Sequence, residues 1–564
     1  MVKKIALASL MACFFGIEVF AQSNEGSVSG NVQIDVQSSK DNPSIGAAEA
    51  PEILLMNGFG NIQYDWKNFR AGIRYEYYYP PMLGFNPNFE GGGLTYRFVQ
   101  FKNEDIDVTF GNFYDQFGSG MIFRTYEERN LGYDNAMEGI RVKYKIQDGV
   151  YLKGLIGKQR LFYDLGPGIV RGLDGEFNMN EVLKPLKDSK LRIDLGLSVV
   201  SKYQKDDGTS LIGSGITGDT LAILPENVAA ISARMALKYG KFAFDAEYVE
   251  KSQDPSTANG LIYKRGTGIL MNASYSQKGF GAVVSAKHID NMDFRSDRTE
   301  AIQNLNINYL PALTRQHAWA LATLYPAATI PTGEMGMQVD INYKVPKNSG
   351  FLGGAFAGAY INLGYSNVYN IHRDPIDGTD VIGGAGTESY KTDYFKVGTD
   401  SLGNKDKFFE EFVFEISKKM NKKLKMTGSY IYTFYNNDIQ QGTKSEQSHI
   451  FSNVAILEAK YKLQKRKSVR VEAQHLWTKQ DHQNWVMGLV EYTIPHYFVA
   501  VQSLYNYGSE KELNYPSISG GYTKGSTKIQ GTYGKQRAGL FCVGGVCREV
   551  PAMDGFTVTI TTSF

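Results

Sequence analysis

In the stretch Leu424-Lys-Met-Thr-Gly-Ser-Tyr-Ile-Tyr-Thr433, apolar or aromatic residues alternate with polar ones. The same alternation recurs at Ala455-Ile-Leu-Glu-Ala-Lys-Tyr461 and at Val469-Arg-Val-Glu-Ala473. Because successive side chains of a β-strand point to opposite faces, each stretch predicts a strand with one apolar face and one polar face. The pattern repeats along the chain, for example at 140–145 and 242–248, and it predicts an all-β protein.

One-sided strands fit two architectures. A soluble sandwich buries the apolar face, whereas a membrane barrel turns that face to lipid and the polar face to a wet lumen. Strands of about ten residues or more are long enough to cross a bilayer when tilted. Short connections such as Gln147-Asp-Gly149 and Gly240-Lys241 alternate with the long stretches 115–137, 295–334 and 367–406, which is typical of a barrel. The sequence therefore predicts a single transmembrane antiparallel up-and-down β-barrel.

The C-terminal stretch supports a barrel and helps to count its strands. Phe556 to Phe564 alternates apolar residues with Thr and Ser and stops on an aromatic residue. This ending resembles the terminal strand of outer-membrane barrels, and the resemblance implies that Phe564 is a signal read by the barrel-assembly machinery. Pairing short turns with long loops gives about 24 strands, within a range of 22 to 26. The first begins near Ser27, one runs from Gly168 to Asn180, and the number is even, as in single-chain bacterial barrels.

The N-terminus predicts export. Lys3 and Lys4 precede an apolar stretch that ends at Phe20, and Ala21 suits a cleavage site, so residues 1–21 are predicted to be a signal peptide and 22–564 the barrel. The alternative is a lipoprotein cleavage box at Cys13, although the apolar run continues beyond it. The predicted location is the cell outer membrane, with outer-membrane lipid and lipopolysaccharide around the barrel.

Charge and motifs exclude several function classes. Lys and Arg total 60 and Asp and Glu total 58, and a net charge of +2 argues against a dedicated nucleic-acid binder. The seven histidines lack HExxH spacing, and neither a P-loop nor GxSxG at a strand-helix junction occurs, so no catalytic residue, cofactor, metal site or enzyme activity is predicted. Asp374, Asp377 and Asp380 leave two interpretations open, a weak calcium site or ordinary turns.

A barrel of this size would leave a wide aqueous hole, so we expect long loops to fold inward and partly close the lumen. The most distinctive candidate is the stretch from Gly111 to Arg129, where glycines and aromatic residues alternate in a way that suits a segment packed inside protein. Charged residues in and after this stretch predict a lumen constriction, while the alternative is a solvated outer loop with ordinary ion pairs. The predicted constriction residues are Arg124, Glu127, Glu128, Arg129, Glu138 and Arg141.

Two cysteines lie in the last outer loop. Cys542 and Cys547 are separated by four residues, with Gly544-Gly545 at the bend, and an exported chain meets an oxidising compartment. A disulfide is the favoured interpretation and free thiols are the alternative. Two cysteines are too few for a structural zinc site.

The residues from Gly111 to Arg160, from Gly168 to Asn180 and from Cys542 to Pro551 resemble a large outer-membrane β-barrel family of Bacteroidota that has no assigned biochemical activity. The resemblance implies a fold and a location but supplies no substrate and no catalytic residues.

The favoured function is a porin-like channel or a transport barrel for small solutes. The alternative is a non-conducting barrel that acts as a scaffold or as an outer-membrane protein partner in secretion, surface-lipoprotein display or outer-membrane assembly. A surface receptor that binds through its long loops is a third class. Inward-facing charges of both signs, including Glu411, Glu458, Lys460 and Arg470, argue against a strongly ion-selective pore and indicate no substrate.

Overall fold

The computed structural model describes residues 26–564 apart from 209–210, 215–217, 301–303, 349–352, 377–381, 389, 401, 443 and 445–446. The predicted signal peptide therefore lies outside the described residues. Asp377 and Asp380 of the calcium hypothesis also lie outside them.

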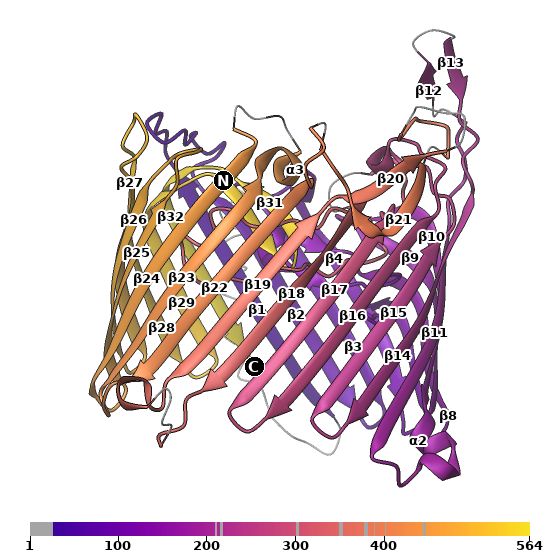
Figure 1. Ribbon diagram of the computed structural model, residues 1–564, viewed down its shortest axis with the longest axis horizontal. Helices are drawn as coiled ribbons and strands as arrows, with labels where there is room; N and C mark the ends of the chain where they lie inside the picture. Colours follow the sequence, from indigo (N-terminus) through magenta and orange to yellow (C-terminus); the bar gives the residue numbers. More distant parts are fainter. Residues whose placement is uncertain are drawn as a thin grey trace.

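Twenty-four antiparallel strands form one closed barrel (Figure 1). Each wall strand pairs with the next wall strand along the chain, and β1 (Ser27–Ser39) pairs with β32 (Met553–Ser563) to close the wall. Phe564 extends this seam, because its backbone exchanges two hydrogen bonds of 3.0 Å with Gly30. The predicted fold class and strand number are confirmed.

The remaining wall strands follow one another around the barrel. In chain order they are β2 (Leu55–Trp66), β3 (Phe69–Tyr78), β4 (Gly91–Lys102), β5 (Ile106–Phe113), β8 (Met137–Gln147), β9 (Val150–Leu161), β10 (Asp164–Asn178), β11 (Leu191–Tyr203), β14 (Asn227–Tyr239), β15 (Phe242–Lys251), β16 (Gly266–Gln277), β17 (Phe280–Asp290), β18 (Gly333–Lys344), β19 (Tyr360–Tyr369), β22 (Lys407–Lys419), β23 (Leu424–Asn436), β24 (His449–Gln464), β25 (Lys467–Trp477), β26 (Trp485–Ile494), β27 (Tyr497–Asn506), β28 (Asn514–Lys524) and β29 (Thr527–Gln536).

Within the described part of the chain, four small hairpins and a few short helices lie in the connections. The hairpins pair β6 (Glu127–Glu128) with β7 (Tyr133–Asp134), β12 (Leu211–Ser214) with β13 (Gly218–Leu221), β20 (Ile371–Pro375) with β21 (Tyr390–Val397), and β30 (Gly539–Val543) with β31 (Val546–Val550). The helices are α2 (Met179–Val182), α3 (Asn437–Gln441), η1 (Pro87–Phe89), η2 (Arg129–Leu131), η3 (Lys184–Leu186), η4 (Thr257–Asn259) and η5 (Gly354–Phe356). No helix within the described part of the chain has the length and apolar character needed to cross a membrane.

The wall follows the alternation that the sequence predicts. In β8, Ile140 and Tyr144 are 41% and 44% exposed on the outer face, whereas Arg141 between them is 8% exposed on the inner face. Aromatic rings gather at the short-turn end, where Phe69 lies 6.2 Å from Trp66 and 5.1 Å from Phe101 between ring centroids. An apolar outer face with an aromatic belt is what lipid contact requires.

Short turns and long loops lie at opposite ends of the barrel. The turns between β8 and β9 and between β14 and β15 are two residues long, and α2 lies at this end. The hairpin β12–β13 projects from the opposite end (Figure 1). Two of the long loops instead turn back into the lumen, where they form the site described next.

Candidate functional site: the lumen plug and its ionic cluster

Two long connections fold back into the barrel. One is residues 114–136, between β5 and β8, and the other is residues 291–332, between β17 and β18. Together we call them the plug. They pair with each other like neighbouring strands, because Arg124 N donates to Ile307 O at 2.9 Å and Tyr309 N donates to Gly120 O at 2.9 Å. The prediction that inward-folded loops close the lumen in part is confirmed.

Residues 114–136 and the first part of the loop 291–332 pack an apolar core against the inside of the wall. Phe117, Phe123, Phe294 and Ile307 are fully buried there. The inward positions that meet them are apolar as well, although the inner face of an open pore is polar. These wall residues are Leu155, Val170, Val200, Val228, Val249, Leu270 and Ile289. The wall is therefore shaped to hold the plug in this part of the lumen.

The later part of the loop 291–332 crosses to the other side of the barrel. Leu313, Leu321 and Tyr325 belong to a second apolar core, which the inner faces of the strands from β22 to β28 complete. Polar contacts fix this segment as well. His317 Nε2 lies 2.7 Å from Glu411 Oε1, and Leu321 N donates to Gln474 Oε1 at 2.8 Å.

Buried lysines of the wall hold the loop at 291–332. Lys251 of β15 donates to the backbone oxygen of Asp293, and Lys287 of β17 donates to that of Pro311. Their side chains are fully shielded from solvent. Lys251 also pairs with Asp254, and Lys287 with Glu334 of β18. A buried cation is tolerated only when it is paired, so each lysine joins the loop to a carboxylate outside it.

The first plug loop leaves an interruption in the wall where it begins. The ladder between β4 and β5 pairs five residues of each strand and ends where Phe98 lies opposite Gly111, whereas β3 and β4 pair ten. Gly111 has φ +97°, and a Cβ there would lie 2.3 Å from Arg97 O. Asn112 Oδ1 accepts the hydrogen bond of Arg97 N at 2.8 Å in place of the ladder. Beyond this point β5 pairs with β8 alone as far as Phe113, after which the chain turns into the lumen. Among the described strands, none pairs with residues 91–97 of β4 on that side.

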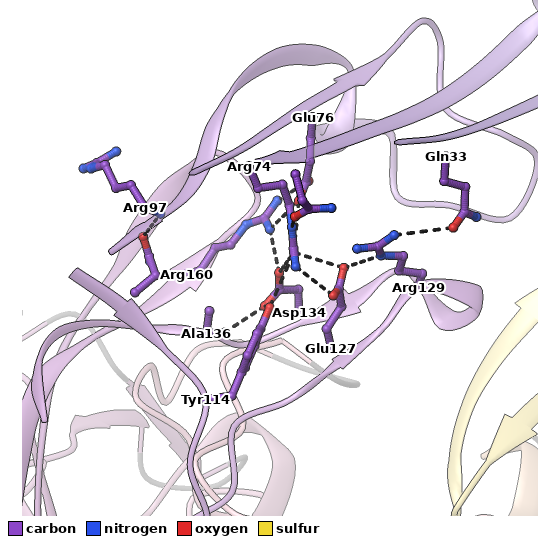
Figure 2. Close-up of polar contacts among 12 residues, drawn as sticks. Gln33, Arg74, Glu76, Arg97, Tyr114, Glu127, Arg129, Asp134, Ala136 and Arg160 are labelled. Carbon is purple, nitrogen blue, oxygen red and sulfur yellow. Dashed lines mark hydrogen bonds and ion pairs between the residues drawn. The ribbon is translucent and has the colours of Figure 1, made fainter. Parts of the chain in front are cut away.

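An ionic cluster spans this interruption from within (Figure 2). Arg160 comes from β9, on the far side, and makes a bidentate pair with Glu76 of β3, with N–O distances of 2.6 Å and 2.9 Å. The same guanidinium lies 2.7 Å from Asp134 of the plug. Arg74 of β3 lies 2.9 Å from Glu127 and 3.3 Å from Asp134. Two wall segments and the plug therefore meet in one set of ion pairs.

The cluster is buried and its charges balance. The side chains of Glu76 and Arg160 are 2% and 4% exposed. Three arginines, Arg74, Arg129 and Arg160, face three carboxylates, Glu76, Glu127 and Asp134. Burial raises the pKa of Asp134, Arg160 and Arg74 oppose that shift, and the nearby Glu127 and Glu76 add to it. Loss of Arg160 or Arg74 would therefore weaken the compensation of Asp134, whose ionised form burial already disfavours.

The same three carboxylates lie within 4.8 Å of one another, which is close enough for a metal ion. The three guanidinium groups already neutralise them, so the cluster fits an ionic lock better than a cation site.

Arg124 joins the two plug loops instead of facing a pore. Its guanidinium carbon lies 4.5 Å from the ring centroid of Tyr126 and 4.1 Å from that of Tyr309. Burial raises the pKa of both tyrosines, which keeps their hydroxyl groups neutral. A cation held between two rings clamps the first loop to the second.

The six predicted constriction residues do not form one charged ring. Glu127 and Arg129 join the ionic cluster, and Arg129 also lies 4.7 Å from the ring of Phe59. Glu128 caps η2 by accepting from Asn130 N. Arg141 faces inward and holds the start of the plug, with Asp107 at 3.2 Å and Asp115 at 3.4 Å.

Glu138 is the clear departure from the predicted constriction. It lies on the outer face of β8 with Ile140, two residues later, because side chains two apart in a strand share a face. Arg141, three residues later, therefore points the other way, and Glu138 pairs with Arg97 at 2.9 Å.

Sequence reasoning missed Arg74 and Glu76, because inward-facing charges are common in every barrel and only the fold brings these two opposite Arg160. The spacing of Arg74 and Glu76, two apart in a strand, showed only that they share a face.

The loop after β29 covers the plug at the long-loop end. A disulfide joins Cys542 and Cys547 across the hairpin β30–β31. The bend of this hairpin accepts two hydrogen bonds from the plug, from Tyr309 Oη to Gly544 O at 2.8 Å and from Thr329 N to Gly545 O at 3.1 Å. The hairpin therefore restrains the outer side of the plug.

On the short-turn side of the plug, the wall encloses an open cavity of about 2000 Å³ between β16 and β27. We call it the vestibule. It begins at the turns and is lined higher up by inward-facing residues such as Asn362 and Ser417.

A closed 24-stranded wall with an apolar outer face and loops folded into its lumen defines a large β-barrel of the outer-membrane type. The chain belongs to a family of unknown function, DUF6029, whose model matches residues 1–564. The predicted membership of a family without an assigned activity agrees with this match, while its origin in Bacteroidota stays a prediction. No curated protein matches the sequence.

Several solved structures share the barrel architecture. A mutant of the ferric enterobactin receptor PfeA from Pseudomonas aeruginosa is 10% identical, with a TM-score of 0.43 and coverage of 97% of this chain and 82% of that one. The translocation pore of the P pilus usher PapC is 9% identical, with a TM-score of 0.42 and coverage of 95% and 99%. The copper transporter OprC is 9% identical, with a TM-score of 0.38 and coverage of 97% and 81%. At these identities and TM-scores the likeness carries no argument about function.

Proposed function

We propose that this protein is an integral outer-membrane barrel that passes small solutes through a lumen gated by its own plug. In this proposal the short-turn end faces the periplasm and lipopolysaccharide contacts the outer rim. Phe564 is read by the barrel-assembly machinery during insertion. The role of the barrel is not catalytic.

The observation that carries the proposal is how the plug is attached. Its first loop is held to the wall by the cluster of Arg74, Glu76 and Arg160 and to the second loop by Arg124. Ions released from a buried pair can be solvated by water, and packed interfaces switch between discrete arrangements instead of deforming continuously. A plug held in this way is suited to leave its seat as a unit.

A second function has its own support. The apolar cores around Phe117 and Leu321 bury the plug residues against the wall, as in a permanent interior. This favours a non-conducting scaffold or partner barrel.

Single-channel recording in planar bilayers separates the two functions. A gated channel should show discrete conductance steps that become more frequent when the ionic cluster is broken by Glu127→Gln. A barrel whose folding is verified by heat-modifiable gel mobility, and which stays silent with and without this substitution, would reject the gated channel and leave the scaffold.

A further inference from the structure

The vestibule has a charge unlike that of the whole chain. Eleven of the side chains that line it are Lys or Arg, and none is Asp or Glu. The entire chain carries a net charge of only +2. The vestibule is therefore basic, although acidic and basic side chains pair with each other at other short turns.

These cations lack a neutralising carboxylate among the residues whose structure is described. Across the residues that the structure describes, none of the eleven takes part in an ion pair with a carboxylate. The basic lining stops at Glu458, two residues above Lys460 on the same face of β24, where Arg470 pairs with Glu458 at 3.5 Å. Below that level every charged side chain that lines the vestibule is positive.

Two of the lysines face each other directly. Lys425 of β23 is the register partner of Lys460 of β24. Like charges at directly opposed positions destabilise a sheet, because their Cβ atoms lie only about 5 Å apart. Lys462 follows on the same face of β24, and the turn before β23 adds Lys422 and Lys423. The wall therefore holds a repulsive arrangement that a bound anion would relieve.

We propose that the vestibule binds small multivalent anions, such as phosphorylated or polycarboxylated solutes, at the periplasmic mouth of the barrel. This inference deepens the proposed function and rests on it, since it names the class of solute that the gated lumen would handle.

A multivalent anion fits better than a monovalent one, because it reaches lysines on several strands at once. Lys344, Lys419, Lys425 and Lys460 come from β18, β22, β23 and β24. Positive charge focused in a recess raises the local concentration of such solutes, and charge-assisted hydrogen bonds to their oxygens hold them. A cavity of about 2000 Å³ leaves room for a small solute with its water.

The test measures binding apart from conduction. Inorganic tripolyphosphate is titrated into the purified full-length barrel by calorimetry. The test variant is Lys425→Gln with Lys460→Gln and Lys462→Gln. The matched control is Lys184→Gln with Lys187→Gln and Lys190→Gln, which removes the same charge at the same end of the barrel but outside the vestibule.

We expect the wild type and the control to bind with affinities within about twofold of each other, and the test variant to bind at least about tenfold more weakly. Raising NaCl from about 50 mM to about 500 mM should weaken wild-type binding, because salt screens exposed charges. Absence of binding by the wild type, or an equal loss in both variants, would overturn the vestibule site. Binding that persists in a barrel that never conducts would keep the site and reject the gated channel. An acidic peptide that binds where tripolyphosphate does not would assign the vestibule to a protein partner instead.

Discussion

Replacing Arg160 with Gln should release the first plug loop from the wall. Arg160 contributes both N–O contacts to Glu76 and the shortest contact to Asp134, at 2.6 Å, 2.9 Å and 2.7 Å. Glutamine keeps part of the volume and removes the charge. Among the described residues, Glu76 and Asp134 would then retain Arg74 as their one cationic partner, at 3.5 Å and 3.3 Å, while Tyr114 and Ala136 N still donate to Asp134.

The size of the effect follows from the burial of the pair. Removing one partner of a buried ion pair costs about 3–5 kcal/mol, because the other charge is left uncompensated. Asp134 can recover part of this cost by taking up a proton, since burial already raises its pKa. The lower end, about 3 kcal/mol, corresponds to roughly a hundredfold change in the equilibrium between seated and displaced plug.

The assay is the labelling rate of a buried thiol by a maleimide. Thr125 in the first plug loop is 3% exposed, and Thr125→Cys places a thiol where only a displaced loop can react. Arg160→Gln should raise its labelling rate roughly a hundredfold. The increase should grow as the pH rises, because a protonated Asp134 is tolerated in the broken cluster and an ionised one is not.

Two variants give the controls. Arg97→Gln breaks an ion pair on the outer face, where Arg97 is 55% exposed, and should leave the labelling rate unchanged. Adding Glu76→Gln to Arg160→Gln removes the uncompensated charge and should restore slow labelling in large part. Slow labelling in Arg160→Gln itself, with a correctly folded barrel, would refute the view that the cluster holds the plug.

Three further predictions concern the loops and the wall. Arg124→Ala removes the cation between the rings of Tyr126 and Tyr309, at a cost of about 1–2 kcal/mol, and should speed amide hydrogen exchange within 117–136, while Arg124→Lys should retain part of the protection. Gly111→Ala forces a Cβ to within 2.3 Å of Arg97 O and should lower the yield of heat-modifiable barrel, whereas Gly154→Ala, which meets no atom within 4 Å, should fold normally. Reducing Cys542–Cys547 should increase protease cleavage within 537–552 and leave the heat-modifiability of the barrel unchanged, because β29 and β32 remain paired along nine residues each.

The sequence predicts the wall well because the pattern of a barrel strand is local. Alternation at 140–145 reports the two faces of that strand without any knowledge of its neighbours, and the structure has these residues within β8. The strand inferred from Gly168 to Asn180 is present as β10, from Asp164 to Asn178. Its start could not be predicted, because the chain shifts register between Leu165 and Ile169.

The interior is harder to predict because its contacts join distant parts of the chain. The glycines and aromatic residues after Gly111 correctly indicate a segment packed inside protein. Its partners Phe294 and Ile307 lie more than 150 residues away, and nothing local marks them. The outward direction of Glu138 could have been predicted from the sequence. Arg141 lies on the polar, inward face of the alternating stretch 140–145, and a residue three positions earlier in the same strand points to the other face.

The interruption in the wall and the plug have the same cause, which is the inward turn of the chain after β5. β5 stops pairing with β4 at Gly111 because the chain must turn inward there to supply residues 114–136. Backbone groups left without a ladder are costly in a membrane wall, so the gap needs another form of closure. Tyr163 Oη donates to Gly91 O at 2.9 Å, Asn112 Oδ1 accepts from Arg97 N, and the ionic cluster joins β9 to β3 through Arg160 and Glu76. Glu127 and Asp134 belong to the same cluster but are carried by the plug. Movement of the plug therefore removes Glu127, Asp134 and Arg129 together and leaves Glu76 with both Arg74 and Arg160. Opening of the lumen and loosening of the wall between β4 and β9 should then occur together.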